Sequence, residues 1–141
     1  MVKQYSLLTA ILIALLLAVT SCGNDTEVTR TPGGTSVGGA NITTGLEIDE
    51  DYVVTEPQTS FEPNQEFYFY FHNNLPFGSE EVTVQLIDNS DDQVLAENSY
   101  DVDPDAAELT DKIWFGSTGM FTIAAKVDGE LRATREVLIE E

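Results

Sequence analysis

Glu66-Phe67-Tyr68-Phe69-Tyr70-Phe71-His72 is the stretch of the chain that decides its fold. Successive side chains of a β-strand point to opposite faces, so one face of this segment carries Phe67, Phe69 and Phe71. The other face carries Tyr68, Tyr70 and His72. Burial of a phenyl ring contributes about 1.5 to 3 kcal/mol. We therefore expect the phenylalanine face to lie in a hydrophobic core.

The region around this strand alternates between apolar and polar residues and is broken by turn signals at short intervals. No segment shows sustained helical spacing, although 105–109 could form one helical turn. The pattern predicts seven strands, at 46–54, 65–73, 82–88, 94–102, 112–115, 119–127 and 131–139. Seven short strands in residues 46–141 predict one all-β domain, a single antiparallel sandwich.

The last two predicted strands are joined through Val127-Asp128-Gly129, and the loop length decides their register. A two-residue loop at Asp128-Gly129 would place Arg132 on the same face as the apolar residues of the preceding strand. A three-residue loop with a positive φ at Gly129 would instead pair Ala125 with Leu131. We favour the three-residue loop because it keeps the apolar residues of both strands together.

Three segments carry a resemblance to a known architecture: Phe61-Glu62-Pro63, Lys112-Ile113-Trp114-Phe115, and the hairpin from Gly119 to Ile139. Their pattern resembles the immunoglobulin-like or fibronectin-type sandwich domains of bacterial surface proteins. The chain lacks the paired cysteines and the intervening tryptophan of antibody-type domains. The resemblance implies an immunoglobulin-like sandwich with an adhesive or accessory role. We expect Trp114 to fill the core, with an exposed anchor as the alternative.

The N-terminus has the pattern of an export signal. Lys3 precedes an apolar run of about 13 positions, which is short for a transmembrane helix. The run ends at Val19-Thr20-Ser21-Cys22, which resembles the lipobox of bacterial lipoproteins. The resemblance implies a signal peptide at 1–21 and acylation of Cys22, the only cysteine. The expected location is the bacterial cell envelope, with the protein anchored to a membrane by its lipid and facing the periplasm or the exterior.

Residues 22–45 are rich in Gly, Thr, Ser and Asn. Such a segment has little apolar surface to offset the entropy of ordering. We expect a flexible tether that begins at the acylated Cys22 and ends where the sandwich begins at residue 46.

The chain has 25 acidic and 6 basic residues and a formal net charge of −19. Affinity for phosphate backbones depends on clustered Lys and Arg, so we expect no nucleic-acid partner. The low number of basic residues also argues that the lipid, and not the protein surface, holds the chain at a membrane. Three hypotheses for the acidity stay open: a soluble surface, a saline habitat, or a cationic protein or metal partner.

The sequence shows no catalytic signature. His72 is the only histidine, and no nucleophile motif accompanies it. We expect no enzyme activity, no cofactor and no metal site. The acidic clusters at 88–92 and 101–108 are interpreted as solvated turns, with calcium binding as the alternative.

Tyr68 and Tyr70 are the candidate partner surface, because tyrosine combines apolar area with a hydroxyl group. The alternative is that a neighbouring loop or strand covers them. The sequence thus predicts a lipid-anchored envelope protein that acts as a non-catalytic binding or structural module, with an envelope protein or a glycan as partner. The alternative function is a calcium-dependent or carbohydrate-binding surface module.

Overall fold

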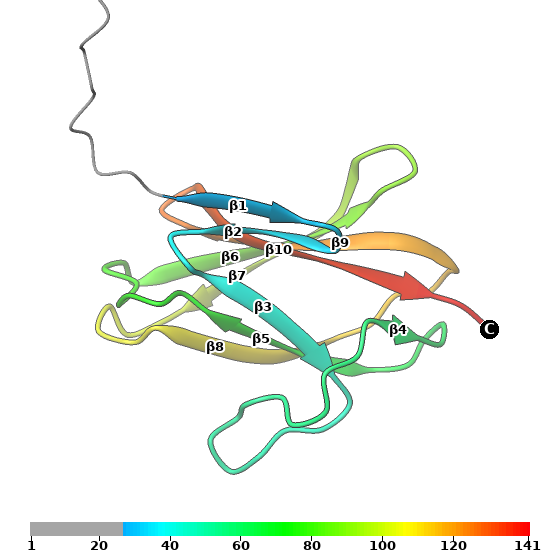
Figure 1. Ribbon diagram of the computed structural model, residues 1–141, viewed down its shortest axis with the longest axis horizontal. Coiled ribbons are helices and arrows are strands. Elements are labelled where there is room, and N and C mark those ends of the chain that lie inside the picture. The colour runs from blue at the N-terminus through cyan, green and yellow to red at the C-terminus, as the bar shows by residue number, and fades with distance from the viewer. Residues whose placement is uncertain (1–26) are drawn as a thin grey trace, which may run out of the picture.

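The computed structural model describes residues 27–141, and these form two β-sheets packed face to face (Figure 1). The described residues contain strands and turns but no helix, which confirms the predicted all-β sandwich. The strands are β1 (Val28–Thr31), β2 (Gly34–Val37), β3 (Asn41–Gly45), β4 (Ser60–Phe61), β5 (Phe67–His72), β6 (Glu81–Asp88), β7 (Gln93–Asp101), β8 (Glu108–Ile113), β9 (Gly119–Val127) and β10 (Glu130–Ile139).

The larger sheet has the strand order β1-β2-β10-β9-β6-β7, and the short β4 pairs with β10. The smaller sheet has the order β3-β5-β8. All pairings are antiparallel except that of β4 with β10. Residues 46–141, for which the sequence predicted about seven strands, contain the seven strands β4 to β10, and β1 to β3 lie before them.

The aromatic strand β5 lies at the centre of the smaller sheet, as its alternation predicts. Phe67, Phe69 and Phe71 are completely buried, whereas Tyr68 and Tyr70 on the opposite face are half-buried. The buried face packs against the apolar face of the larger sheet, where the core residues include Val82, Val84, Phe121, Ile123, Val137 and Ile139. The prediction of a phenylalanine core is confirmed.

The hairpin of β9 and β10 turns over two residues, so the three-residue loop predicted from sequence is wrong. Val127 pairs with Glu130, and the turn residues Asp128 and Gly129 have φ values of 53° and 76°. Two positive φ values in succession are typical of a type I′ turn, whose twist suits antiparallel strands. A register shift between Leu131 and Ala133 then returns the apolar residues of β10 to the core.

The flexible tether predicted for 22–45 is wrong over residues 28–45, which form β1, β2 and β3. Ala40 and Ile42 are completely buried, and β3 pairs with β5 over its whole length. The backbone N–H of Glu136 in β10 donates to the carbonyl of Gly33 at 2.8 Å. The polar segment is ordered because its backbone groups pair with strands far along the chain.

Other boundaries also differ from the prediction. The strand expected at 46–54 is a loop with a single bridge between Ile48 and Val54, because Asp49 turns the chain by accepting from the N–H groups of residues 51 and 53. Residues 105–109, which could have formed a helical turn, are not helical, and β8 begins within them at Glu108. The signal peptide and Cys22 lie outside the described residues. Within residues 27–141, no helix has the length and apolar character needed to cross a membrane.

Candidate functional site

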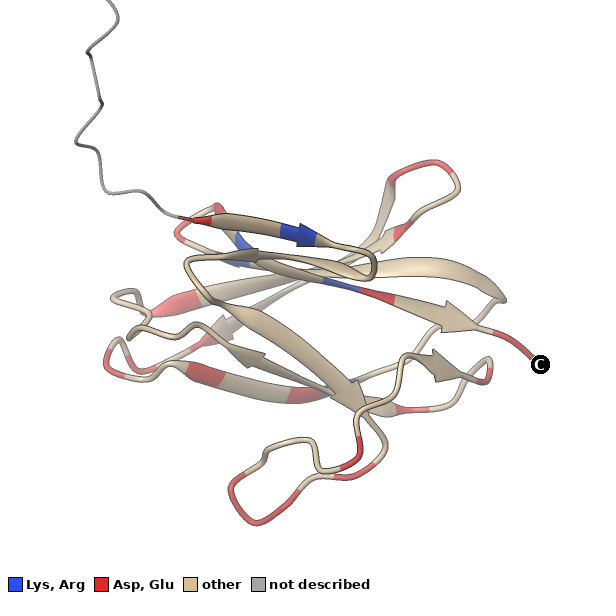
Figure 2. Ribbon diagram, viewed as in Figure 1, with Lys and Arg blue, Asp and Glu red and all other residues tan. Residues whose placement is uncertain are grey.

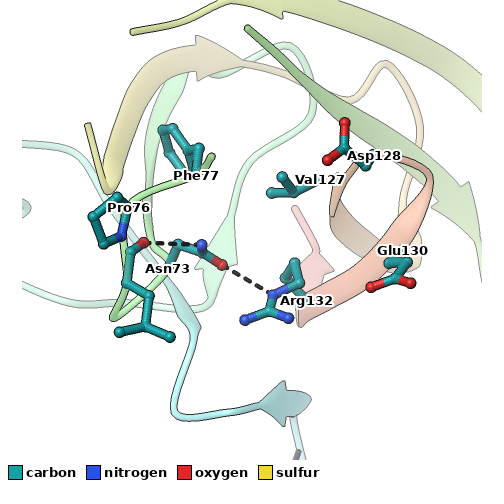
Figure 3. A pocket seen from close by; sticks show the side chains of 8 residues that line it. Asn73, Pro76, Phe77, Val127, Asp128, Glu130 and Arg132 are labelled. Atoms are coloured by element: carbon teal, nitrogen blue, oxygen red, sulfur yellow. Dashed lines mark hydrogen bonds between the residues drawn. The ribbon is translucent and has the colours of Figure 1, made fainter. Parts of the chain in front are cut away.

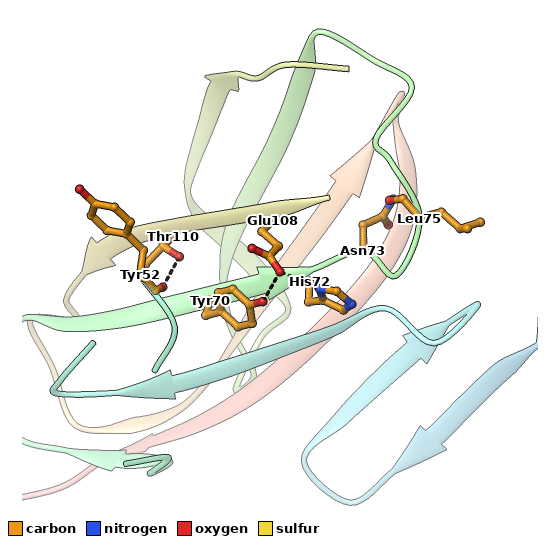
Figure 4. A network of polar contacts seen from close by, with 7 residues as sticks. All are labelled: Tyr52, Tyr70, His72, Asn73, Leu75, Glu108 and Thr110. Atoms are coloured by element: carbon orange, nitrogen blue, oxygen red, sulfur yellow. Dashed lines mark hydrogen bonds and ion pairs between the residues drawn. The ribbon is translucent and has the colours of Figure 1, made fainter. Parts of the chain in front are cut away.

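The outer face of β5 carries a polar network built on Glu108, the residue of β8 that pairs with His72 (Figure 4). The hydroxyl of Tyr70 donates to Oε1 of Glu108 at 2.7 Å. The same oxygen lies 3.4 Å from Nδ1 of His72. The rings of Tyr70 and His72 stack with centroids 6.3 Å apart. The sequence predicted that Tyr70 and His72 share a face, and the pairing with β8 adds the carboxylate.

The His72–Glu108 contact is short, but its geometry is not that of a hydrogen bond. Nδ1 of His72 is buried and has no hydrogen-bond partner among residues 27–141. A distance of 3.4 Å with poor alignment provides an electrostatic attraction only when the imidazole is protonated. The network thus joins β5 to β8 through the Tyr70–Glu108 hydrogen bond.

The loop between β3 and β4 partly covers this face (Figure 4). The hydroxyl of Thr110 in β8 donates to the carbonyl of Tyr52 in the loop at 2.8 Å. Burial, the hydrogen bond to Glu108 and the negative charges of Glu108 and Asp49 raise the pKa of Tyr70 to about 12. The hydroxyl of Tyr70 is therefore already bonded to Glu108, although its ring is only half-buried.

Tyr68, the second candidate of the partner surface, lies beside Lys112 in the register of β5 and β8. The ammonium of Lys112 lies 5.1 Å from the centroid of the Tyr68 ring, which is the geometry of a cation–π contact. The same ammonium is 4.0 Å from a carboxylate oxygen of Glu66, and both side chains are exposed. The two tyrosines thus lie in different surroundings, one under a loop and one beside a cation.

A pocket of about 260 Å³ opens beyond the end of β5, between Pro76 and the β9–β10 turn (Figure 3). The side chain of Asn73 is buried there and accepts from Nε of Arg132 at 3.1 Å. The amide of Asn73 also donates to the carbonyl of Leu75 at 3.0 Å. These hydrogen bonds connect the loop after β5 to Arg132 of β10 and so fix the loop to the larger sheet.

A groove of about 350 Å³ lies between the edge strands of the two sheets, β7 and β8. Trp114 borders it and is 56% exposed, so the expectation that Trp114 fills the core is wrong. Its neighbours Ile113 and Phe115 are buried, and period-two alternation turns the residue between them outward. This alternation is visible in the sequence and was the signal for the exposed position.

The opposite side of the groove is formed by Leu95, Ala96 and Asn98 of β7. Leu95 is 49% exposed, and no sequence pattern predicted this because the register of β6 and β7 shifts beside it. Towards the other end of β7, the hydroxyl of Tyr100 donates to Asp111 of β8 at 2.8 Å. A hydrogen bond therefore joins β7 to β8 at Tyr100, and the groove separates the two strands near Trp114.

The acidic clusters form turns. Asp88 accepts from the backbone N–H of Ser90, and Asp103 accepts from that of Asp105. The hydrogen bonds from Ser90 lower the pKa of Asp88. Among residues 27–141, no group of three or more His, Cys, Asp or Glu side chains is arranged to hold a metal ion.

Comparison with known proteins gives little that bears on this site. No protein-family model matches the chain, and no curated protein matches it. Among solved structures, the soluble domain of PmoD from Methylocystis sp. ATCC 49242 (Rockwell) is similar, with 12% identity and a TM-score of 0.49. The alignment covers 84% of this chain and 100% of that chain. We take neither fold nor function from a likeness of this size.

Proposed function

We propose that the protein is a lipid-anchored component of the bacterial cell envelope whose immunoglobulin-like sandwich binds a partner without catalysis. The anchor is Cys22, at the end of an apolar segment too short to span a bilayer. Several acyl chains hold a protein stably where one would not, since each buried methylene adds about 0.8 kcal/mol. The proposal includes no nucleic-acid partner, because the chain has only 6 basic residues against 25 acidic ones.

The observation that carries the binding function is the exposure of Trp114. A tryptophan that is 56% exposed beside an apolar groove keeps a large apolar area in water. Aromatic anchors of this kind dominate the binding energy of many protein interfaces. The groove is therefore a stronger candidate than the tyrosine face, where Tyr70 is already bonded to Glu108.

Palmitate labelling and globomycin treatment test the anchor. Palmitate labelling should mark the wild-type chain and not Cys22→Ala, and globomycin should block processing of the wild type. Labelled Cys22→Ala would contradict the anchor.

Crosslinking in native envelopes followed by affinity capture tests the binding function. The wild type should retain a partner that Trp114→Ala loses. Tyr52→Ala is the matched control, because Tyr52 is an exposed aromatic residue on a loop outside the groove. Equal capture by Trp114→Ala and the wild type would contradict the groove as the binding site.

A glycan is the second candidate ligand. Asn64 and Trp114 both lie against Gly116, since a Cβ placed on that residue would be 3.6 Å from Oδ1 of Asn64 and from the indole. An indole ring flanked by amide groups suits the apolar face and the hydroxyls of a sugar. Trp114 is the only tryptophan, so its fluorescence reports on the groove directly. Titration with oligosaccharides, with and without calcium, should change this fluorescence if the ligand is a sugar.

A further inference from the structure

β7 forms a free edge of the larger sheet. Within residues 27–141, β7 pairs with β6 alone, and its other side faces away from the sheet. An edge strand presents a row of unpaired N–H and C=O groups that can pair with another chain. β7 has 9 residues, whereas β1 at the opposite edge has 4. The longer free edge is the one beside the groove.

Apolar side chains gather at this edge. Val94 and Leu95 of β7 are 46% and 49% exposed, and Trp114 borders the same groove as Leu95. Natural proteins commonly protect edge strands with charged residues, proline or cover from a loop. At Val94 and Leu95 the edge has a register shift in its pairing with β6 and keeps apolar side chains in water.

The charged residues of β6, β7 and the turn between them are all acidic. β6, β7 and the turn between them contain no basic residue, and their acidic residues are Glu81, Asp88, Asp91, Asp92, Glu97 and Asp101. Four of the basic residues lie elsewhere, on β1, β9 and β10 (Figure 2). Lys112 is the one cation at the groove, and it lies over Tyr68.

We infer that the free edge of β7 binds an extended, basic segment of a partner protein, which adds a strand to the sheet and places an apolar side chain in the groove beside Trp114. This inference rests on the proposed binding function and specifies the chemistry of the partner. Main-chain hydrogen bonds supply affinity in such β-augmentation, and pockets for alternate side chains supply specificity. Basic residues of the segment face the carboxylates of Glu97 and Asp101.

A second copy of this chain fits the edge poorly. Two β7 strands laid side by side would bring the acidic residues of both chains together. Each chain also carries a formal net charge of −19, and like charges across an interface oppose association. Charge complementarity therefore selects a cationic partner over self-association.

The test uses the mature, acylated chain in nanodiscs of phosphatidylcholine, with empty nanodiscs as the background. The probe is a synthetic peptide that alternates lysine with valine or phenylalanine. Two matched peptides accompany it: one with glutamate in place of lysine, and one with N-methyl groups on the backbone nitrogens that would pair with β7. Calorimetry and Trp114 fluorescence measure binding.

We expect the basic peptide to bind with an affinity that falls as salt rises, and each matched peptide to bind at least about tenfold more weakly. Leu95→Ala should weaken binding by a similar factor, and Val28→Ala on the other edge should leave it unchanged. Glu97→Lys provides a second variant at an exposed position of β7, where the carboxylate accepts from Gln85, and it should also weaken binding of the basic peptide. Each variant is used only after its melting temperature matches that of the wild type.

Equal binding of the N-methylated and unmodified peptides would overturn the inference, since the edge would then play no part. No binding of the basic peptide would also overturn it. If Trp114-dependent capture from envelopes persists in that case, or if an oligosaccharide alone changes the fluorescence, the proposed binding function survives without the basic strand. Loss of both peptide binding and Trp114-dependent capture would remove the function as well.

Discussion

The guanidinium Nε of Arg135 donates to the backbone carbonyl of Ile42 at 2.7 Å and joins the two sheets of the sandwich. Arg135 belongs to β10 of the larger sheet, and Ile42 belongs to β3 at the edge of the smaller one. A hydrogen bond that involves a charged group is stronger than a neutral one. The contact thus satisfies a carbonyl on an edge strand and fixes the position of β3.

Replacement of Arg135 with methionine should lower the free energy of unfolding by about 1.5 to 3 kcal/mol, the usual value for a hydrogen bond to a charged group. Methionine keeps the aliphatic part of the side chain, so the decrease in the free energy of unfolding reflects loss of the hydrogen-bond donor. Urea denaturation measures this decrease. Arg30→Met, at an exposed position of β1, is the control and should change stability by less than about 0.5 kcal/mol. Equal effects of the two variants would contradict the structural role of Arg135.

Gly34→Ala should destabilise the chain by about 1 to 3 kcal/mol. A Cβ at Gly34 would collide with the carbonyl oxygen of Thr134 in β10, and neither backbone can move without breaking the pairing of β2. Gly116→Ala is the matched control, since the nearest atoms there are 3.6 Å away. Thermal melting of both variants checks the prediction, and a stable Gly34→Ala protein would refute it.

Phe69→Ala should cost about 3 to 5 kcal/mol, because the ring is completely buried between the sheets. Phe69→Asp should prevent stable folding, since a carboxylate there would have no partner in the core. Circular dichroism and chemical denaturation distinguish the two outcomes. Tyr68→Ala, on the half-buried face of the same strand, should cost clearly less.

Stability should fall as the pH rises from about 10 to 12. Burial and the hydrogen bond to Glu108 raise the pKa of Tyr70 from 10.0 to about 12, and burial and Asp111 raise that of Tyr100 further. In this window the unfolded chain loses the phenolic protons while the folded chain keeps them, so rising pH favours unfolding. Melting temperatures against pH measure the effect. The Tyr70→Phe and Tyr100→Phe variants should show a shallower alkaline decline, and an unchanged decline would contradict the assignment.

Period-two alternation, a local property, was enough to predict the central strand. It placed Phe67, Phe69 and Phe71 in the core, where they pack against the apolar face of the larger sheet. The same rule could have placed Trp114 outside, since Ile113 and Phe115 on either side of it are buried. The candidate groove was therefore partly visible in the sequence, through its tryptophan.

The sequence by itself determined the all-β class, the phenylalanine core and the acidic surface, because these follow from the residue types and their local order. Only the tertiary structure decided that residues 28–45 are strands, since their order depends on pairing with β5 and β10. It also decided the two-residue turn at Asp128-Gly129, where the register shift after Leu131 restores the apolar face of β10. Backbone pairing between distant segments leaves no local pattern in the residues, and neither does a register shift. The groove lies between β7 and β8, which are edge strands of different sheets, so it too depends on the tertiary structure.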